Sequence, residues 1–240
     1  MTRWQGQVES TEWLTPLLIR VVLGGEGLAG FEMPDATDTY VNVALPPDGL
    51  RRRYTVRSWD PATGRLTLDF VVHGDDGVGG PWAAAAAPGD ALDFDGPSGG
   101  YRPDPTADWH LLVGDESALP AIAASLEACP DGVPVLVRLL CDGPDHEIDL
   151  ATPSGLDLQW LHRPASLPDA VAGLSLPSGR GHAFVHGEAE EIRAIRRHLL
   201  TDGGFTRPDM SCSPYWRRTM TDEAWRTVKK DFVAAMEADV

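Results

Sequence analysis

The sequence predicts an antiparallel β-barrel or sandwich followed by a parallel α/β domain. Short alternating strands fill the first hundred residues, whereas beyond residue 105 buried strands alternate with helices. A proline-rich segment, residues 97–105, separates the two patterns. The length of 240 residues and the 42% hydrophobic content suffice for two modest domains with buried cores. We place these domains at residues 1–104 and 105–240.

Five alternating runs predict strands in the first domain: residues 17–23, 39–45, 54–59, 66–72 and 91–94. Turn residues such as Gly24-Gly25 and the segment 61–64 punctuate them, and the alanine run 83–87 predicts a short helix.

In the second domain, apolar runs predict strands at residues 109–113, 133–140, 158–161 and 183–185. Helical patterns at residues 119–128 and 188–200 lie between or after them, which implies parallel strands joined by right-handed crossovers. A charged helix at residues 222–236 carries Trp225, Val228 and Phe232 on one face, so we expect it to pack on the domain.

The composition excludes several classes of function. Because 36 Asp and Glu outnumber 20 Lys and Arg, the net charge is −16, which disfavours nucleic acid and membrane surfaces as partners. Cys129, Cys141 and Cys212 form no CxxC, and the seven histidines lack paired-ligand spacing, so we expect free thiols and no metal site. The N-terminus resembles no secretory signal and no apolar stretch is long enough to span a bilayer, so we expect a cytoplasmic protein.

Arginines gather in the segment 51–57, RRRYTVR. Strand alternation places Arg53, Thr55 and Arg57 on one face and Arg52 and Tyr54 on the other. A guanidinium suits phosphate oxygens, and an aromatic ring with a nearby hydroxyl can flank a planar heterocycle. A solvated basic edge strand is the alternative.

Two further segments are candidate nucleotide sites. The glycine-rich residues 73–82 precede a helix, whose first backbone amides can hold a pyrophosphate, although a plain surface loop has the same composition. The turn at residues 114–120 follows the first parallel strand, where α/β sheets bind ligands. Asp115 and Glu116 would oppose a diphosphate there unless they turn away as helix caps; a structural capping turn is the alternative.

Taken in order, these segments resemble the siderophore-interacting protein family, flavin-dependent ferric-siderophore reductases related to the ferredoxin-reductase superfamily. Residues 52–57 resemble its RxYTxR flavin signature, and residues 114–122 are close to its GDETALPAI block. Further blocks match at residues 70–74, 82–83, 88–90, 96–97, 160–163, 187–188 and 215–217.

The resemblance implies an N-terminal antiparallel six-stranded barrel that binds FAD and a C-terminal parallel-sheet α/β domain that binds NADPH or NADH. It implies an oxidoreductase that releases iron by reducing a ferric siderophore. The alternatives are a non-reducing siderophore-binding protein of the same fold and a general flavin reductase or electron-transfer flavoprotein.

Carried over from the family, Arg52 faces the FAD pyrophosphate, Tyr54 packs on the flavin and ribityl region, and Thr55 hydrogen-bonds near the reactive flavin nitrogen. Tyr54 and Thr55 are therefore the candidate catalytic residues. The resemblance implies cofactor contacts at Arg52, Tyr54, Thr55, Val56, Arg57, Val72, His73, Gly74, Gly79, Gly80, Trp82, Gly114, Asp115, Ser117, Ala118, Gly187, Glu188 and Trp216.

The sequence departs from the family at a few positions. Gly80 stands where a hydroxyl is expected near the pyrophosphate, which leaves that contact to backbone amides. A 2′-phosphate on the reductant would need a cation, for which Arg163 is one candidate. An anionic siderophore would meet positive charge at Arg57, Arg102, Arg217 and Arg218.

Overall fold

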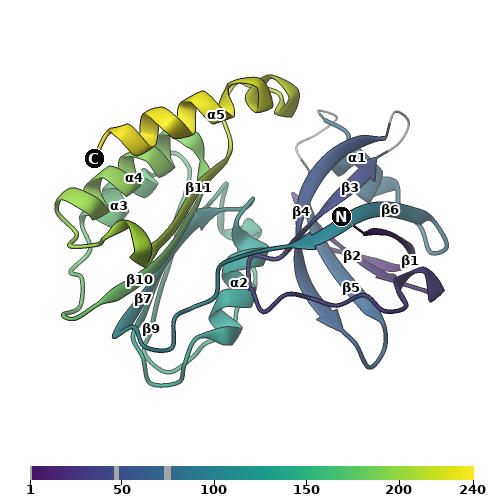
Figure 1. Cartoon of the computed structure of the whole chain (residues 1–240), viewed down its shortest axis with the longest axis horizontal. Helices are drawn as coiled ribbons and strands as arrows, with labels where there is room; N and C mark the ends of the chain where they lie inside the picture. Colours follow the sequence, from purple (N-terminus) through teal and green to yellow (C-terminus); the bar gives the residue numbers. More distant parts are fainter. Residues whose placement is uncertain (1, 46–48, 73–76) are drawn as a thin grey trace. The chain divides into compact units, whose positions relative to one another are not determined.

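The computed structural model describes residues 2–45, 49–72 and 77–240. The chain divides into two compact units: Met1–Arg102 with Ala123–Ser125, and Pro103–Ile122 with Leu126–Val240. The first is a closed antiparallel barrel of six strands and the second a parallel sheet of five strands with helices (Figure 1). The predicted fold class is confirmed.

The barrel closes in the strand order β1-β2-β5-β4-β3-β6, and β6 pairs with β1. Side chains that alternate along β3 and β5, among them Val41, Val43 and Leu68, are fully buried in its core. The short 3₁₀ helix Glu26–Leu28 follows β2, and helix α1, Gly79–Ala85, precedes β6. The strands are β1 (Arg3–Thr15), β2 (Leu18–Gly24), β3 (Tyr40–Leu45), β4 (Leu50–Asp60), β5 (Arg65–Val71) and β6 (Ala91–Ser98).

Strand β1 is not among the strands that alternating runs predict in the sequence, for a physical reason. Gly6, Val8 and Thr15 are its only buried residues, and two irregularities in its pairing with β2 break the alternation. Most of its side chains face solvent, so they need not be apolar. Helix α1 also begins at Gly79 instead of Ala83, because packing against β5 overrides the weak helix propensity of glycine.

The second unit has the strand order β11-β10-β7-β8-β9, with every pair parallel. Helices α3 and α4 cover one face of the sheet and α2 the other (Figure 1), so β7 and β8 are buried throughout. The strands are β7 (Trp109–Asp115), β8 (Val135–Cys141), β9 (Leu156–His162), β10 (Gly181–Glu188) and β11 (Met210–Trp216). The helices are α2 (Leu119–Ala128), α3 (Leu167–Ala172), α4 (Ala189–Thr201) and α5 (Asp222–Ala238), with 3₁₀ turns at Pro144–His146 and Arg207–Asp209.

Strand β11 is the fifth parallel strand, one more than the pattern predicts. Its sequence, MSCSPYW, is polar and contains Pro214, which is tolerated because β11 is an edge strand. In the part of the chain that is described, no helix has both the length and the hydropathy to cross a membrane.

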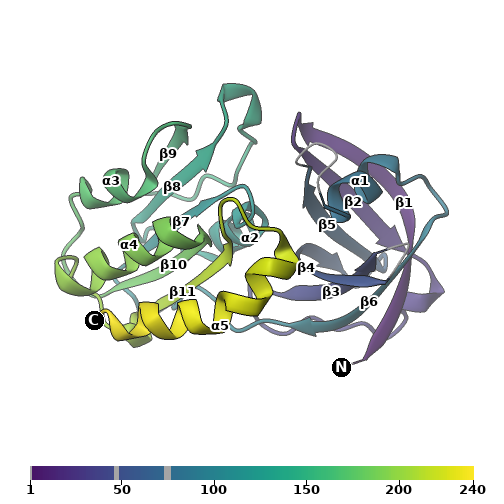
Figure 2. The same cartoon turned by 90° about the horizontal axis from the view of Figure 1, so that it is seen from above.

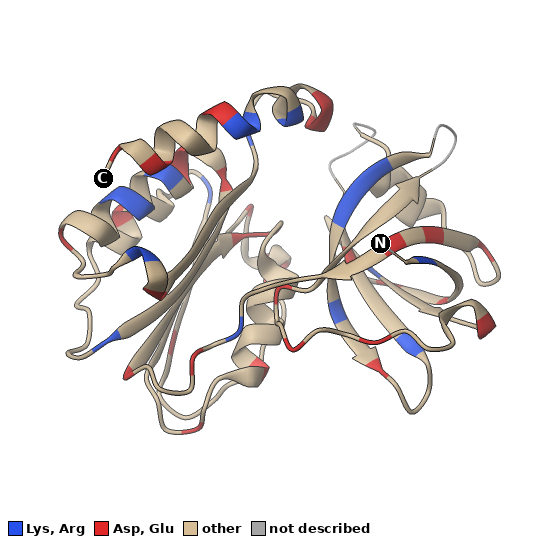
Figure 3. Cartoon of the chain, in the orientation of Figure 1, with Lys and Arg blue, Asp and Glu red and all other residues tan. Residues whose placement is uncertain are grey.

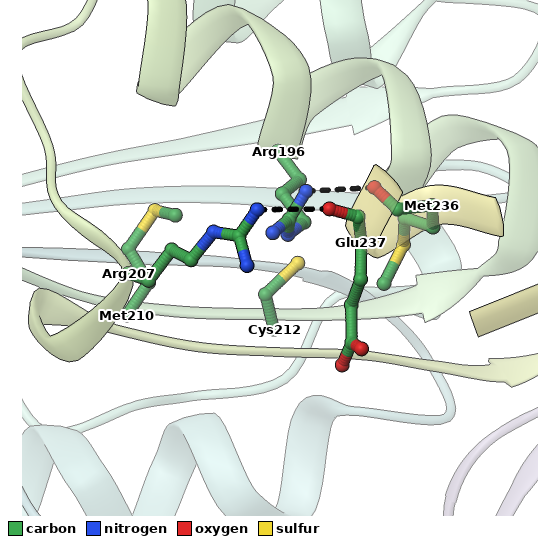
Figure 4. A pocket seen from close by; sticks show the side chains of 6 residues that line it. All are labelled: Arg196, Arg207, Met210, Cys212, Met236 and Glu237. Atoms are coloured by element: carbon green, nitrogen blue, oxygen red, sulfur yellow. Dashed lines mark hydrogen bonds between the residues drawn. The ribbon is translucent and has the colours of Figure 1, made fainter. Parts of the chain in front are cut away.

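Helix α5 packs on the α/β unit, as predicted (Figure 2). Trp225, Phe232 and Met236 bury its apolar face. Two arginines donate to carbonyl oxygens in its last turn: Arg196 Nη1 to Met236 O at 2.8 Å and Arg207 Nη2 to Glu237 O at 2.9 Å (Figure 4). They line a cavity of about 160 Å³. Cations at a helix C-terminus stabilise its dipole, which gives these arginines a structural role.

His110 makes stability depend on pH. Its ring is fully buried on β7 near that of His182, 6.1 Å away between centroids, and burial, aided by His182, lowers the pKa of His110 to about 4. The unfolded chain therefore binds a proton between pH 6.5 and 4 that the folded chain excludes. As the pH is lowered from 6.5 to 4, we therefore expect the free energy of unfolding to fall by about 2–3 kcal/mol. Urea denaturation of the wild type and His110→Leu checks this, and an equal pH slope in both proteins contradicts it.

Candidate functional site

Strand β4 presents the arginine-rich segment on both faces of the barrel wall. Arg52 and Tyr54 pair opposite two fully buried valines of β3, so they lie on the inner face. Thr55 pairs opposite Tyr40 on the outer face, together with Arg53, whose guanidinium lies 5.0 Å from the Tyr40 ring centroid. The predicted alternation is confirmed from Arg52 to Thr55.

The alternation ends at a register irregularity between Val56 and Ser58. Arg57 is the additional residue there, so simple alternation no longer fixes its face and its predicted grouping with Arg53 and Thr55 does not follow. The Val56 side chain is buried in the barrel core and its backbone N donates to Thr39 O at 2.7 Å, so neither group is available to a ligand.

The hydroxyl end of the Tyr54 side chain contacts helix α1. The Tyr54 ring lies 4.1 Å from that of Phe70 between centroids, and Phe70 lies 5.5 Å from Trp82. A Cβ atom on Gly79 would overlap the Tyr54 hydroxyl. One on Gly80 would lie 3.0 Å from the Val72 Cα atom. Both glycines therefore allow the first turn of α1 to contact the strands directly, a reason that the sequence pattern alone does not reveal.

These residues fit a flavin dinucleotide. Arg52, Tyr54, Thr55 and Arg57 are each half-buried, so they remain accessible from solvent. The guanidinium matches a pyrophosphate, the tyrosine ring matches a flat heterocycle, and the threonine hydroxyl supplies a hydrogen-bonding group. Figure 3 shows the basic stretch of β4 in a chain whose net charge is −16. His73 and Gly74, the other predicted contacts, lie outside the described residues.

In the α/β unit, the strand order reverses direction between β7 and β10. Open α/β sheets bind ligands at such a point, beyond the carboxyl ends of the strands. Gly114 and Asp115 end β7, and Gly187 and Glu188 end β10. The structure therefore brings together two segments that the sequence nominated separately.

Asp115 links three segments at this end of the sheet. It is 1% exposed, and its Oδ1 accepts hydrogen bonds from Ser117 N at 2.9 Å and Ser117 Oγ at 2.5 Å. Its Oδ2 accepts from Glu188 N at 3.0 Å and Trp216 Nε1 at 2.8 Å. Burial raises the pKa of Asp115, opposed by the hydrogen bonds from Ser117 and Trp216. The side chain is thus used inside the fold, where it positions its neighbours.

Close packing explains the two glycines. A Cβ on Gly114 would lie 2.6 Å from the Ala118 Cβ atom and 2.7 Å from His186 O. Gly187 has φ +149°, and a Cβ there would lie 2.7 Å from Asp115 Oδ2. Ala118 is fully buried, whereas Ser117 and Trp216 are half-buried and can be reached. Small residues therefore bring the backbone of the turn close to β10.

The acidic residues of the turn have partners within the fold. Glu188, 3% exposed, caps α4 by accepting from Glu190 N at 2.8 Å and Glu191 N at 3.1 Å. Glu116 accepts two hydrogen bonds from Arg163, at 2.5 Å and 2.8 Å. Asp115 and Glu116 are therefore bonded inside the fold, although neither caps helix α2, whose N-cap residue is Ala118 without a side-chain hydrogen bond.

Three arginines considered for an anionic siderophore, Arg102, Arg217 and Arg218, pair with carboxylates. Each pair lies within a single unit of the chain. The pairs are Arg102 with Asp35 at 2.8 Å, Arg217 with Glu190 at 2.7 Å and Arg218 with Glu191 at 3.2 Å. Cys129, Cys141 and Cys212 are free thiols, and within the described ranges no three metal-ligating side chains converge.

Comparison with known proteins places the chain in a family. Residues 107–219 match the siderophore-interacting protein family, and residues 7–52 and 48–101 match the siderophore-interacting FAD-binding domain. The chain is 33% identical to the ferric vibriobactin reductase ViuB of Vibrio cholerae, with 89% of each chain covered. It belongs to the siderophore-interacting protein family. The family predicted from the sequence is confirmed.

Solved structures of other siderophore proteins share the whole fold. A siderophore utilization protein from T. fusca superposes with a TM-score of 0.84 at 32% identity, covering 92% of this chain and 95% of that one. The siderophore-interacting protein SipS from Aeromonas hydrophila superposes with a TM-score of 0.87 at 26% identity, covering 97% of this chain and 98% of that one. The ferredoxin reductase of carbazole 1,9a-dioxygenase superposes with a TM-score of 0.70 at 18% identity, covering 87% of this chain and 68% of that one. This likeness shows a shared fold alone.

Proposed function

We propose that this member of the family is an FAD-dependent NAD(P)H:ferric-siderophore oxidoreductase that reduces siderophore-bound Fe(III) to Fe(II). The observation that carries the proposal is the accessible Arg52–Thr55 stretch of β4, with Tyr54 against Gly79, in a barrel that matches a siderophore-interacting FAD-binding domain. The relationship to a ferric vibriobactin reductase supports the iron-reducing activity.

In this proposal the barrel binds FAD through residues of β4 and α1. Arg52 donates to the pyrophosphate, Tyr54 packs beside the flavin and ribityl region, and Thr55 hydrogen-bonds near the reactive flavin nitrogen. Backbone amides next to Gly79 and Gly80 take the place of a side-chain hydroxyl. Bound FAD supplies a ring that accepts a hydride and passes electrons on one at a time.

In the α/β unit, the turn from Gly114 to Ala118 and the end of β10 would approach the nicotinamide nucleotide. Asp115 and Glu188 act there as positioning residues, because their carboxylates are engaged inside the fold. Each hydride carries two electrons and each Fe(III) accepts one, so one reductant molecule releases two iron ions. Oxygen ligands hold Fe(II) more weakly than Fe(III), so reduction frees the metal from its chelator.

An absorption experiment tests the function. The purified protein is titrated with FAD, then with NADH or NADPH without oxygen, and then with ferric catecholate or hydroxamate chelates in the presence of an Fe(II)-specific dye. We expect flavin binding, bleaching by a reductant, and dye colour on adding the chelate. Failure to bind FAD overturns the proposal. Chelate binding without reduction indicates a carrier, and turnover restricted to free flavins indicates a general flavin reductase.

Arg52→Ala should weaken FAD binding about 10- to 30-fold, since it removes charge-assisted hydrogen bonds of about 1.5–2 kcal/mol. Flavin fluorescence titration of the apoprotein measures this. Arg65→Ala is the matched control, because Arg65 is an exposed barrel arginine on β5 that pairs with Glu9 at 2.7 Å and lies outside the predicted cofactor contacts. Equal weakening in both variants would indicate a general effect of charge and contradict the role of Arg52.

A further inference from the structure

A cavity of about 460 Å³ lies beside the carboxyl ends of β8 and β9 in the α/β unit. Its size is that of a small-molecule site, and its place in the sheet is where such folds bind nucleotides. Its polar lining comes from four side chains on separate segments: Arg163, Ser166, Glu191 and Arg218.

Arg163 is held by carboxylates on the protein. Both of its terminal nitrogens bond Glu116, at 2.5 Å and 2.8 Å, and Nη1 also lies 3.0 Å from Asp142 Oδ1. The Glu116 side chain is 12% exposed and that of Arg163 29%, so this forked pair is partly shielded from water and salt. The hydrogen bonds that Arg163 donates to Glu116 raise the pKa of Arg163 above its ordinary value.

Arg218 is likewise paired within the cavity wall. Its Nη2 lies 3.2 Å from Glu191 Oε1, and its backbone N donates to Glu188 Oε1 at 3.1 Å. Three carboxylates, those of Glu116, Asp142 and Glu191, therefore offset two guanidinium groups, and the wall has no surplus of positive charge.

We propose that this cavity receives the adenosine ribose of the reductant and that the Glu116–Arg163 pair makes the protein prefer NADH to NADPH. The inference rests on the proposed function, because it concerns the nicotinamide that reduces the flavin. A 2′-phosphate would have to break the forked pair and would then lie beside the carboxylate that this leaves unpaired, whereas a 2′-hydroxyl can donate to a carboxylate oxygen.

Binding to the purified protein tests the preference without turnover. Calorimetric titration compares ADP-ribose with its 2′-phosphorylated form, and we expect at least tenfold tighter binding of the form without phosphate. Glu116→Gln removes one charge and breaks the forked ion pair, which leaves Asp142 as the carboxylate beside Arg163, so it should shift this ratio at least tenfold towards the 2′-phosphate. Glu147→Gln is the matched control, because Glu147 pairs with His162, 2.8 Å away, and does not line the cavity.

Equal affinity for the two ligands, or tighter binding of the phosphorylated one by the wild type, overturns the inference. So does an unchanged ratio in Glu116→Gln; if that variant does not fold, the wild-type ratio decides. Flavin reduction by NADH and NADPH is measured in parallel and reports on the proposed function. Reduction by both with equal efficiency overturns only the preference, whereas reduction by neither overturns both.

Discussion

Replacing Asp115 with alanine should lower the free energy of unfolding by about 3–5 kcal/mol. The substitution leaves donors on Ser117, Glu188 and Trp216 without their acceptor, and the Glu188 amide is buried where water cannot easily replace that acceptor. Relief from burying a carboxylate whose pKa is raised offsets part of this loss. Chemical denaturation followed by circular dichroism measures the change.

Ser117→Ala is the graded control for this prediction. It removes the hydroxyl hydrogen bond to Asp115 but keeps the backbone one, so the expected loss is about 1 kcal/mol. If Asp115→Ala costs no more than Ser117→Ala, Asp115 does not hold the ends of β7, β10 and β11 together.

Replacing Gly79 with alanine should weaken FAD binding about 100-fold, equivalent to about 2.7 kcal/mol. The added Cβ would overlap the Tyr54 hydroxyl, so either the tyrosine or the first turn of α1 must move. Both belong to the proposed flavin site. Alanine also favours helix by up to about 1 kcal/mol, so a loss cannot come from helix propensity. Fluorescence titration of the apoprotein measures the affinity, and thermal melting by circular dichroism checks the fold.

Two variants make the Gly79 experiment decisive. Gly100→Ala is the matched control, since a Cβ there meets nothing within 4 Å and we expect a change of less than about twofold. Tyr54→Phe combined with Gly79→Ala removes the colliding oxygen, so it should bind FAD more tightly than Gly79→Ala alone. Equal affinities in the single and double variants would contradict the steric explanation.

The elements that could be predicted from sequence are those whose burial produces a clear period. Helix α2 has the predicted bounds, 119–128, and β7 and β8 are found because their apolar runs are buried on both faces. Strands β1 and β11 have polar, partly exposed sequences that carry no comparable period. Their pairing partners, β6 and β10, decide that they are strands.

The candidate site could be located but not explained from sequence. The resemblance points to Asp115 and Trp216, yet their hydrogen bond joins residues 101 positions apart, and no local pattern indicates it. The same holds for the steric contact between Gly79 and Tyr54. The Glu116–Arg163 pair is visible only once β7 and β9 occupy one sheet, so the acidic turn and the candidate phosphate-binding arginine look independent in the sequence.

Closure of the barrel bears on self-association. Each of its six strands has a neighbouring strand on both sides, so the barrel, as far as its residues are described, has no border strand to which another molecule could add. In the parallel sheet, β9 and β11 are the border strands, and Pro214 in β11 lacks the amide needed to extend a ladder. Intermolecular strand addition during heat or acid stress should therefore begin at β9, which makes its outer side the place to add a charged gatekeeper when a less aggregation-prone variant is wanted.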